Sequence, residues 1–472
     1  MPKTKTKLAK FFNFLFLISP LILCFSYYPI ITLGHSDSMN LELSLPLIWL
    51  VLYVTVAAIL YIKTYKKFPA VSRKGLILCL FPVYLTVSLL WAPNLLRGVL
   101  VTGIVWLIWL AVFLSFKLRD FLQPLKSKLV KSIFSAAIIV SAFCWLQSIL
   151  DVLGVDRSTT LMCKGCVSAT FGFPHPNGFA VEPQFMGNLL IAPTLLAIYE
   201  FYKKSNAKNF VLVLFLATTL FFTFSRGAIY SFAIAIILML ATLIIKQKTA
   251  RPLLIIPILI LSFACSLNAQ GLMAMSSSTN DTYASGIIKS LDQLTLGIFD
   301  LKINNDSSQT NNDLILNNND SNQNNKDFNE TNNDSYYDGY VEVSTTGRLS
   351  ISASSLKVWK STATNFWFGV GIGGTGVALY EAGELDYKTE PGQNEYCTIL
   401  LELGIVGAII LVITLIVAFK FLPAELRHSP LFASLVLAYA FSILFFSGLP
   451  NALHIYLMPI FTVPFIKKGK KS

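Results

Sequence analysis

The sequence predicts an all-α polytopic membrane protein with about twelve transmembrane helices, both termini in the cytoplasm and one large extracytoplasmic loop. Two observations carry this prediction: long apolar segments recur along the chain, and basic residues gather in alternate connections between them. The composition agrees, because hydrophobic residues make up 54% of the 472 residues and charged residues only 13%. A soluble domain contains roughly 25% charged residues, so this composition is typical of a membrane protein.

Most of the apolar segments approach the length that a membrane-spanning helix needs, about 20 residues. The stretch 209–245 is too long for one crossing, because a helix of 37 residues would reach about 55 Å. The only polar break inside it is Ser225-Arg226-Gly227, where we therefore expect a turn. The predicted spans are 11–33, 44–62, 75–91, 98–116, 132–153, 184–202, 209–224, 228–245, 252–270, 397–419, 430–447 and 452–466.

Lys and Arg residues orient these spans, since basic residues concentrate in cytoplasmic loops. With the N-terminus in the cytoplasm, 26 of the 37 Lys and Arg residues fall in seven inside segments. The formal net charge of +12 is therefore a topology signal, and we expect no nucleic-acid partner. The inside segments are 1–10, 63–74, 117–131, 203–208, 246–251, 420–429 and 467–472.

The longest polar segment divides the chain into three parts. Residues 1–270 hold the first nine predicted helices, 271–396 form the extracytoplasmic loop, and 397–472 hold the last three helices. Within the loop, residues 303–335 are dominated by Asn and Asp and bury too little apolar surface to fold alone. We expect a disordered insertion there, followed over 348–359 by a helix that lies on the membrane surface.

Two arginines on the predicted outer face are candidates for binding an anion. Arg226 lies at the edge of an apolar segment, where a charge is costly and usually functional. The alternative is that its side chain only extends to the membrane–water interface and binds nothing. Arg348 lies in a polar loop, where a charge is most often simply solvated. Guanidinium groups bind phosphate through paired hydrogen bonds and stay charged, so two on one face would suit a lipid-linked diphosphate.

The glycine-rich stretch 369–376 has a G-x-G-x-x-G spacing. It does not follow a predicted strand in a βαβ unit, so we reject dinucleotide binding and expect a close-approach turn over the active face. Further along, Glu402 lies in an apolar run. Such a carboxylate is either a functional group or a structural one that is bound to a neighbouring helix.

The segment 173–184 contains two further candidates. His175 could act as a general acid or base, although an exposed loop histidine is the commoner case. Glu182 precedes a predicted helix, where a carboxylate is favoured electrostatically whatever its function.

Four of these elements occur in a familiar order: Ser-Arg-Gly at 225–227, Thr-Gly-Arg-Leu leading to Trp over 346–359, the glycine-rich turn, and Asn-Glu-Tyr followed by Leu-Glu-Leu-Gly-Ile-Val-Gly over 394–407. Over about 170–450 the chain resembles the O-antigen ligase-like membrane proteins, which include O-antigen ligases and O-antigen polymerases. No single motif is specific, so the resemblance rests on their order and spacing.

The resemblance implies transfer of a glycan from undecaprenyl diphosphate to an acceptor glycan or lipid-linked sugar, at the outer face of the cytoplasmic membrane. It implies no metal and no cofactor. The implied catalytic residues are Arg226, Arg348, Gln393 and Glu395, with the arginines stabilising negative charge on the leaving diphosphate. The implied substrate-binding residues are Ser225, Gly371, Asn394, His175 and Glu182.

The chain departs from the family at Gln393, where ligases usually carry a His. A Gln can hydrogen-bond to an acceptor hydroxyl but cannot take its proton. Either no strong base is needed, or Glu390, Glu395 or His175 serves. The polymerase function is therefore at least as compatible with the sequence as the ligase function.

Two alternatives come from other classes. A transporter or flippase of lipid-linked glycans would also have many helices, but we expect it to show polar residues deep in several spans and an internal repeat. A metal-dependent glycosyltransferase would carry paired acidic residues in its first outer loop, where Asp37 and Glu42 are a poor match.

Overall fold

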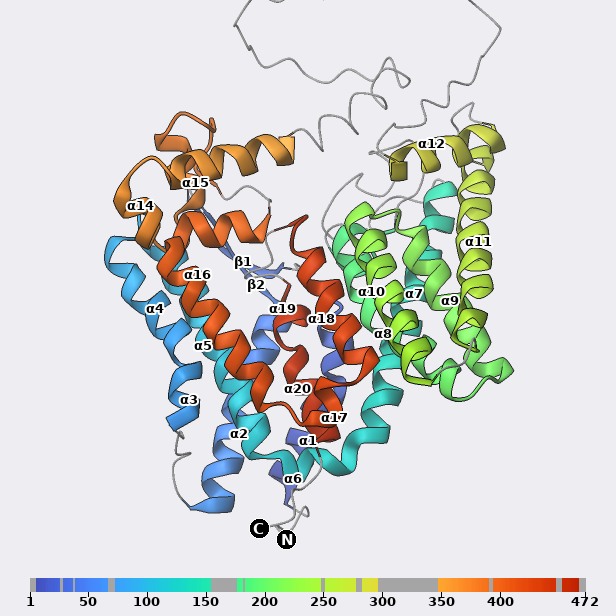
Figure 1. Ribbon diagram of the computed structural model, residues 1–472, viewed down its shortest axis with the longest axis horizontal. Coiled ribbons are helices and arrows are strands. Elements are labelled where there is room, and N and C mark those ends of the chain that lie inside the picture. The colour runs from blue at the N-terminus through green and yellow to red at the C-terminus, as the bar shows by residue number, and fades with distance from the viewer. Residues whose placement is uncertain are drawn as a thin grey trace, which may run out of the picture.

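Figure 1 shows the computed structural model of the chain. The structure describes residues 6–25, 29–36, 39–66, 73–153, 176–180, 183–247, 251–276, 282–295, 347–389, 394–446 and 452–466. His175, Glu182, Gln393 and the predicted Asn-rich insertion lie outside these ranges.

Helices dominate every described part of the chain. The N-terminal elements are α1 (Lys7–Ile22), β1 (Pro29–Ser36), β2 (Met39–Ser44), α2 (Leu45–Tyr65), α3 (Arg73–Leu78), α4 (Leu80–Ser88), η1 (Leu89–Trp91), α5 (Leu95–Lys117), α6 (Arg119–Leu122), η2 (Gln123–Leu125) and α7 (Lys126–Val152). The central elements are α8 (Pro183–Lys203), α9 (Ala207–Phe222), α10 (Arg226–Gln247), η4 (Arg251–Leu254), α11 (Ile255–Ser276) and α12 (Tyr283–Thr295). The C-terminal elements are a helix over 347–359, α14 (Ala363–Phe368), α15 (Thr375–Glu381), α16 (Glu395–Phe421), α17 (Ala424–Arg427), α18 (Pro430–Ser442), α19 (Leu453–Tyr456), α20 (Met458–Thr462) and η5 (Val463–Phe465).

Seven helices in the described part of the chain are long and apolar enough to cross a membrane. Three further apolar helices are shorter, over 75–91, 207–222 and 430–442. The chain is therefore a multi-pass, predominantly helical membrane protein, while the count of twelve spans stays a prediction. The turn expected within 209–245 is confirmed, because α9 ends at Phe222 and α10 begins at Arg226.

One hairpin interrupts the otherwise helical chain. The expected first span over 11–33 ends early, with α1 stopping at Ile22, and the chain then forms the antiparallel pair β1–β2. Its register runs from Pro29 opposite Ser44 to Ser36 opposite Met39, with two irregularities. The physical reason is local: Pro29 cannot donate a helical hydrogen bond, and the β-branched run that follows it favours extended backbone.

Two apolar cores lie side by side in the bundle (Figure 1). One joins α1, α2, α5 and α6 with α19 and α20, and its largest buried side chains include Phe12, Phe16 and Tyr53. The other joins α7 through α11 with α18, and it includes Phe222 and Phe232. Because α18 and α19 follow one another in the chain but belong to different cores, the C-terminal segment ties the two halves together.

The two ends of the bundle carry different elements. At one end, η2 packs against η5, and the Gln123 side chain donates to the Ile466 carbonyl, so the last described residues lie beside the α5–α7 connection. At the other end lie α12, the helix 347–359, α14 and the starts of α8, α10 and α16 (Figure 1). This second end, here called the site end, holds the candidate functional residues.

Candidate functional site

The starts of α8 and α10 are packed closely through small residues. A Cβ added at Gly187 would lie 2.6 Å from Ala228 Cβ and 3.0 Å from Thr223 Oγ1, so only glycine fits there. Small residues at helix contacts allow this approach in membrane proteins, where van der Waals packing drives helix association. The contact places the beginning of α8 directly beside the turn that precedes α10.

That turn contains a strained residue. Phe224 has a φ of 45°, in the left-handed region, and its ring is 1% exposed. Non-glycine residues in this region cost about 1 kcal/mol or more, and they cluster at functional sites. The strained turn directs the chain from α9 into α10, so that Arg226 becomes the first residue of α10 with a half-buried side chain.

Ser225 acts as a cap of α10 in this structure. Its Oγ accepts a hydrogen bond from the Ala228 N–H at 3.4 Å, and its own N–H donates to Thr223 Oγ1 at 3.4 Å. A serine that caps a helix start satisfies a backbone N–H that would otherwise lack an intrahelical partner. The predicted substrate-binding role of Ser225 is not tested by this contact and stays a prediction.

Arg348 is held by a triangle of hydrogen bonds. Its Nη1 donates to Gln184 Oε1 at 3.1 Å and to the Phe445 carbonyl at 3.2 Å, and Gln184 Nε2 donates to the same carbonyl at 3.2 Å. A guanidinium has five N–H donors. Both of these Arg348 hydrogen bonds come from Nη1, which fixes the orientation of the whole group. The side chain is otherwise exposed.

The α10 start meets the same short segment. A Cβ added at Gly227 would lie 3.0 Å from Phe445 Cβ, so the residue after Arg226 packs directly on Phe445. The Arg348 side chain and Gly227, the residue that follows Arg226, therefore both contact Phe445. The structure brings the start of α10 close to the residue that holds Arg348, which is 122 positions from Arg226 in the sequence.

Asn394 and Glu395 join this place from α16. The Glu395 N–H donates to the Ile443 carbonyl at 3.0 Å, and the Asn394 side chain caps the helix by accepting from the Tyr396 N–H at 2.9 Å. Glu395 is 6% exposed, and its Oε1 accepts a hydrogen bond from the Tyr456 hydroxyl at 3.1 Å. Its backbone anchor, Ile443, is two positions before the carbonyl that holds Arg348.

The starts of three helices and the Arg348 side chain thus meet at residues 443–445. This arrangement is here called the helix-start cluster, and it comprises the helix-start residues Gln184, Ser225, Arg226, Asn394 and Glu395 together with Arg348. Two consecutive Cα steps span at most about 7.6 Å, so the groups bound to Ile443 and Phe445 lie close together. Helix N-termini carry positive potential and bind anions. The carbonyls that α18 brings here are already occupied by the Glu395 N–H, Gln184 and Arg348.

The glycine-rich loop lies elsewhere on the site end, against a break in α16. Gly404 has φ 62° and ψ −170°, which interrupts the helix and frees the carbonyls of residues 401–403. The loop and α4 supply the missing donors: Val370 N–H to Leu401 O at 2.9 Å, Gly371 N–H to Glu402 O at 2.9 Å, and Tyr84 OH to Leu403 O at 2.8 Å. The loop therefore braces α16 with its backbone.

Close approach explains the glycines of this brace. A Cβ at Gly369 would lie 2.3 Å from the Glu402 carbonyl, and one at Gly371 would lie 2.5 Å from Ala92 Cα. Glu402 is 5% exposed and accepts from Thr375 Oγ1 at 2.9 Å, at the start of α15. Of the two roles considered for Glu402, this contact favours the structural one. Gly371 packs on the η1 turn and α16 rather than on segment 443–445, and its predicted substrate contact is not tested.

The helix over 347–359 packs on α15 and the first turns of α16 through Val358, Trp359 and Leu379. Its Lys357 pairs with Glu384 at 2.5 Å, and Ser354 donates to the same carboxylate at 2.6 Å. These two contacts, the Lys357 hydrogen bond first, hold the pKa of Glu384 below its ordinary value. The predicted surface helix is thus attached to the protein along its length.

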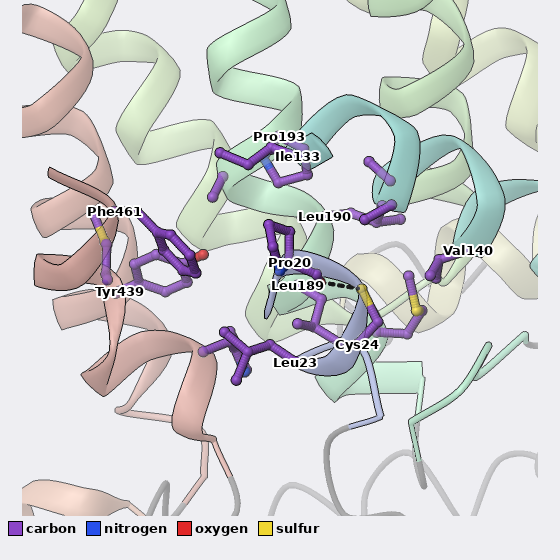
Figure 2. A pocket seen from close by; sticks show the side chains of 16 residues that line it. Pro20, Leu23, Cys24, Ile133, Val140, Leu189, Leu190, Pro193, Tyr439 and Phe461 are labelled. Atoms are coloured by element: carbon purple, nitrogen blue, oxygen red, sulfur yellow. Dashed lines mark hydrogen bonds between the residues drawn. The ribbon is translucent and has the colours of Figure 1, made fainter. Parts of the chain in front are cut away.

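An apolar cavity of about 100 Å³ lies among α1, α7, α8, α18 and α20 (Figure 2). Pro20, Leu190, Pro193, Tyr439 and Phe461 contribute to its lining. None of the predicted site residues lines this cavity among the residues that the structure describes. We therefore place the candidate site at the helix-start cluster.

Two residues that hold side chains of the cluster, Gln184 and Tyr456, were not singled out from the sequence. Gln184 was present in the segment 173–184 but carried no signal of its own, because a neutral amide at a helix start is common. Tyr456 is 61 positions from Glu395 and lies in an apolar segment, so only the folded chain reveals their contact.

One family model matches part of the chain. Residues 211–412 match the family model described as O-Antigen ligase. No curated protein and no solved structure gives a match to the chain. The matched region runs from within α9 into α16, so it includes Arg226, Arg348, the glycine-rich loop and Glu395, while Gln184 and Tyr456 lie outside it.

Proposed function

We propose that this multi-pass membrane protein, whose residues 211–412 match the O-antigen ligase family model, moves a glycan from undecaprenyl diphosphate to an acceptor sugar. The family implies a glycosyltransferase-like enzyme with lipid-linked and acceptor glycans as substrates. The proposal adds the donor, a metal-independent reaction and its place, the extracytoplasmic face of the cytoplasmic membrane.

The contacts of Gly227 and Arg348 with Phe445 carry the proposal, because they bring the start of α10, whose first residue is Arg226, close to Arg348. A diphosphate needs several donors and positive charge in one place, and guanidinium groups supply both without titrating. The starts of α8, α10 and α16 add positive helix potential at the same point. Two guanidinium groups suit an anion with two phosphate groups better than one charged side chain would.

In the proposed reaction, an acceptor hydroxyl attacks the anomeric carbon, and the bond from that carbon to the diphosphate oxygen breaks. Arg226 and Arg348 stabilise the negative charge that develops on the leaving diphosphate. Loss of one such preorganised donor typically lowers turnover about 10²- to 10³-fold. Gln393 is proposed to orient the acceptor hydroxyl, and Ser225, Gly371, Asn394, His175 and Glu182 are proposed to contact substrate.

A flippase or transporter remains the alternative class, and the break in α16 is the observation that would favour it. Discontinuous helices in transporters expose backbone groups to substrate. Here Val370, Gly371 and Tyr84 donate hydrogen bonds to the carbonyls at the break. These carbonyls are therefore bound within the protein and not exposed to a substrate. The transferase proposal is therefore better supported.

The test is glycan transfer by purified protein with an undecaprenyl-diphosphate oligosaccharide and an acceptor, with and without EDTA. We expect transfer to survive EDTA and to be lost in Arg226→Ala and Arg348→Ala, whereas Lys360→Ala, a surface lysine beside Trp359, keeps wild-type activity. Product length would separate polymerase from ligase. Donor binding without transfer to any acceptor would instead favour the transporter.

A further inference from the structure

Glu395 is a buried carboxylate at the edge of the proposed diphosphate site. It is 6% exposed and begins α16, the helix whose first turns run beneath the helix 347–359 that carries Arg348. Its backbone N–H is anchored on Ile443, two positions from the carbonyl that holds Arg348. A charged group that is this buried is expensive unless it is hydrogen-bonded.

Tyr456 supplies such a hydrogen bond from a distant part of the chain. Its hydroxyl donates to Glu395 Oε1 at 3.1 Å. Tyr456 ends α19 and packs against the apolar core of α7 through α11 with α18, while Glu395 belongs to α16. The bond therefore fixes the carboxylate rotamer with respect to a rigid core, and an ionised carboxylate has acceptor sites on both oxygens.

Gln393 cannot accept a proton from the acceptor hydroxyl. If the reaction uses a general base, another residue must supply it. Among the described residues, Glu402 is the other buried carboxylate, and it is bound to Thr375 at the brace. Glu395 instead begins α16 at Ile443, two positions from the carbonyl that holds Arg348.

Resting on the proposed function, we propose that Glu395 accepts the proton of the acceptor hydroxyl and that Tyr456 is a positioning residue for its carboxylate. As the acceptor oxygen bonds to the anomeric carbon, the bond from carbon to diphosphate oxygen breaks and its electron pair leaves with the diphosphate. The hydroxyl proton passes to the Glu395 carboxylate. Glu395 releases that proton to solvent or to the departing diphosphate, which restores the carboxylate.

The experiment compares Glu395→Gln, Glu395→Asp and Tyr456→Phe in full-length protein, with separate measurement of kcat, KM for both substrates, and donor binding. General-base removal typically costs about 10²- to 10⁴-fold, so we expect Glu395→Gln to lose at least 100-fold in kcat with donor affinity within about threefold. Glu395→Asp keeps a carboxylate and should retain more activity than Glu395→Gln. Tyr456→Phe should lower kcat about tenfold with both KM values little changed, since it removes only the hydrogen bond.

Tyr396→Phe is the matched control. The Tyr396 hydroxyl also bonds to the C-terminal part of the protein, donating to the Ala440 carbonyl at 2.7 Å, but it does not hold Glu395. If the Tyr456 contact were only a structural tie, both tyrosine variants would change melting temperature alike and neither would change kcat selectively. A selective decrease in kcat for Tyr456→Phe supports the positioning role.

The outcomes separate this inference from the proposed function. If wild-type protein transfers glycan and Glu395→Gln transfers it with unchanged kcat, only the inference is overturned. If wild-type protein binds the lipid-linked donor but transfers it to no acceptor, the proposed function fails and the inference fails with it. If Glu395→Gln does not accumulate in the membrane, Tyr456→Phe against Tyr396→Phe decides.

Discussion

The helix-start cluster and the glycine-rich brace lie at the same end of the bundle, yet they are built in different ways. The cluster consists of side chains, with Arg348, Gln184 and Glu395 gathered around residues 443–445. The brace consists of backbone, with Val370 and Gly371 donating to carbonyls that the break in α16 has freed. Both were expected on the active face, but only the cluster combines cationic side chains with several helix starts.

The difference teaches what each sequence signal means in this protein. Glycines mark close approach of backbones, and their N–H groups are used within the fold. The printed side-chain hydrogen bonds of Arg348 come from one nitrogen, and we propose that the arginines at the helix starts bind substrate. Substitutions in the cluster should therefore lower activity in folded protein, whereas substitutions in the brace should lower the amount of folded protein.

The largest expected effect on activity comes from Arg226→Lys. Lysine keeps the charge but not the planar fork that binds a diphosphate with paired hydrogen bonds. We expect turnover to fall about 10²-fold or more while the membrane yield stays at the wild-type level. Full activity in a normally folded Arg226→Lys protein would contradict the assignment of the cluster as the anion site.

The largest expected effect on folding comes from Gly404→Ala. Alanine would have to adopt the φ of 62°, and its Cβ would lie 2.5 Å from the Trp367 carbonyl. We expect a loss of about 3 kcal/mol or more, measured as reduced folded yield and melting temperature. Gly103→Ala is the control, because Gly103 lies in α5 with no heavy atom within 4 Å of an added Cβ, and the change should be neutral or slightly stabilising.

A smaller effect, on donor affinity, is expected from Gln184→Glu, which tests the charge next to Arg348 in the cluster. The substitution keeps the shape of the side chain and places a negative charge beside Arg348, which neutralises part of the anion site. We expect donor affinity to fall about tenfold, or about 1.4 kcal/mol, in a binding assay. Gln123→Glu, at the opposite end of the bundle, should leave donor affinity unchanged; an equal loss in both variants would show a general effect of charge.

The smallest effect concerns pH and the surface contact of the helix 347–359. Because the folded-state pKa of Glu384 is lowered, first by Lys357 and then by Ser354, its ionised form contributes stability above the ordinary pKa of the carboxyl group. That contribution is lost as pH falls through the lowered value. We expect a slight decrease in melting temperature on acidification below about pH 4, and this part of the decrease should be absent in Glu384→Gln.

Much of the architecture was predictable from local composition. Long apolar runs gave the helices, and a polar break gave the turn before α10, because a membrane-spanning segment has a fixed length. The β1–β2 hairpin was missed, since a run of apolar and β-branched residues fits a strand or a helix equally well when read alone. The break in α16 was missed for a similar reason: Gly404 is one glycine among apolar residues, and its conformation depends on the loop that packs against it.

The sequence by itself determined that this is a multi-pass membrane protein, that Arg226 and Arg348 are its candidate anion-binding residues, and that Gln393 departs from the pattern of the family that the chain resembles. These conclusions depend on residue type and on spacing along the chain. Only the tertiary structure decided that the start of α10 and Arg348 meet at Phe445, that Gln184 holds Arg348, that Tyr456 holds Glu395, and that the glycine-rich loop braces α16. Such contacts join residues tens to hundreds of positions apart, and distance in space is not encoded in any local pattern.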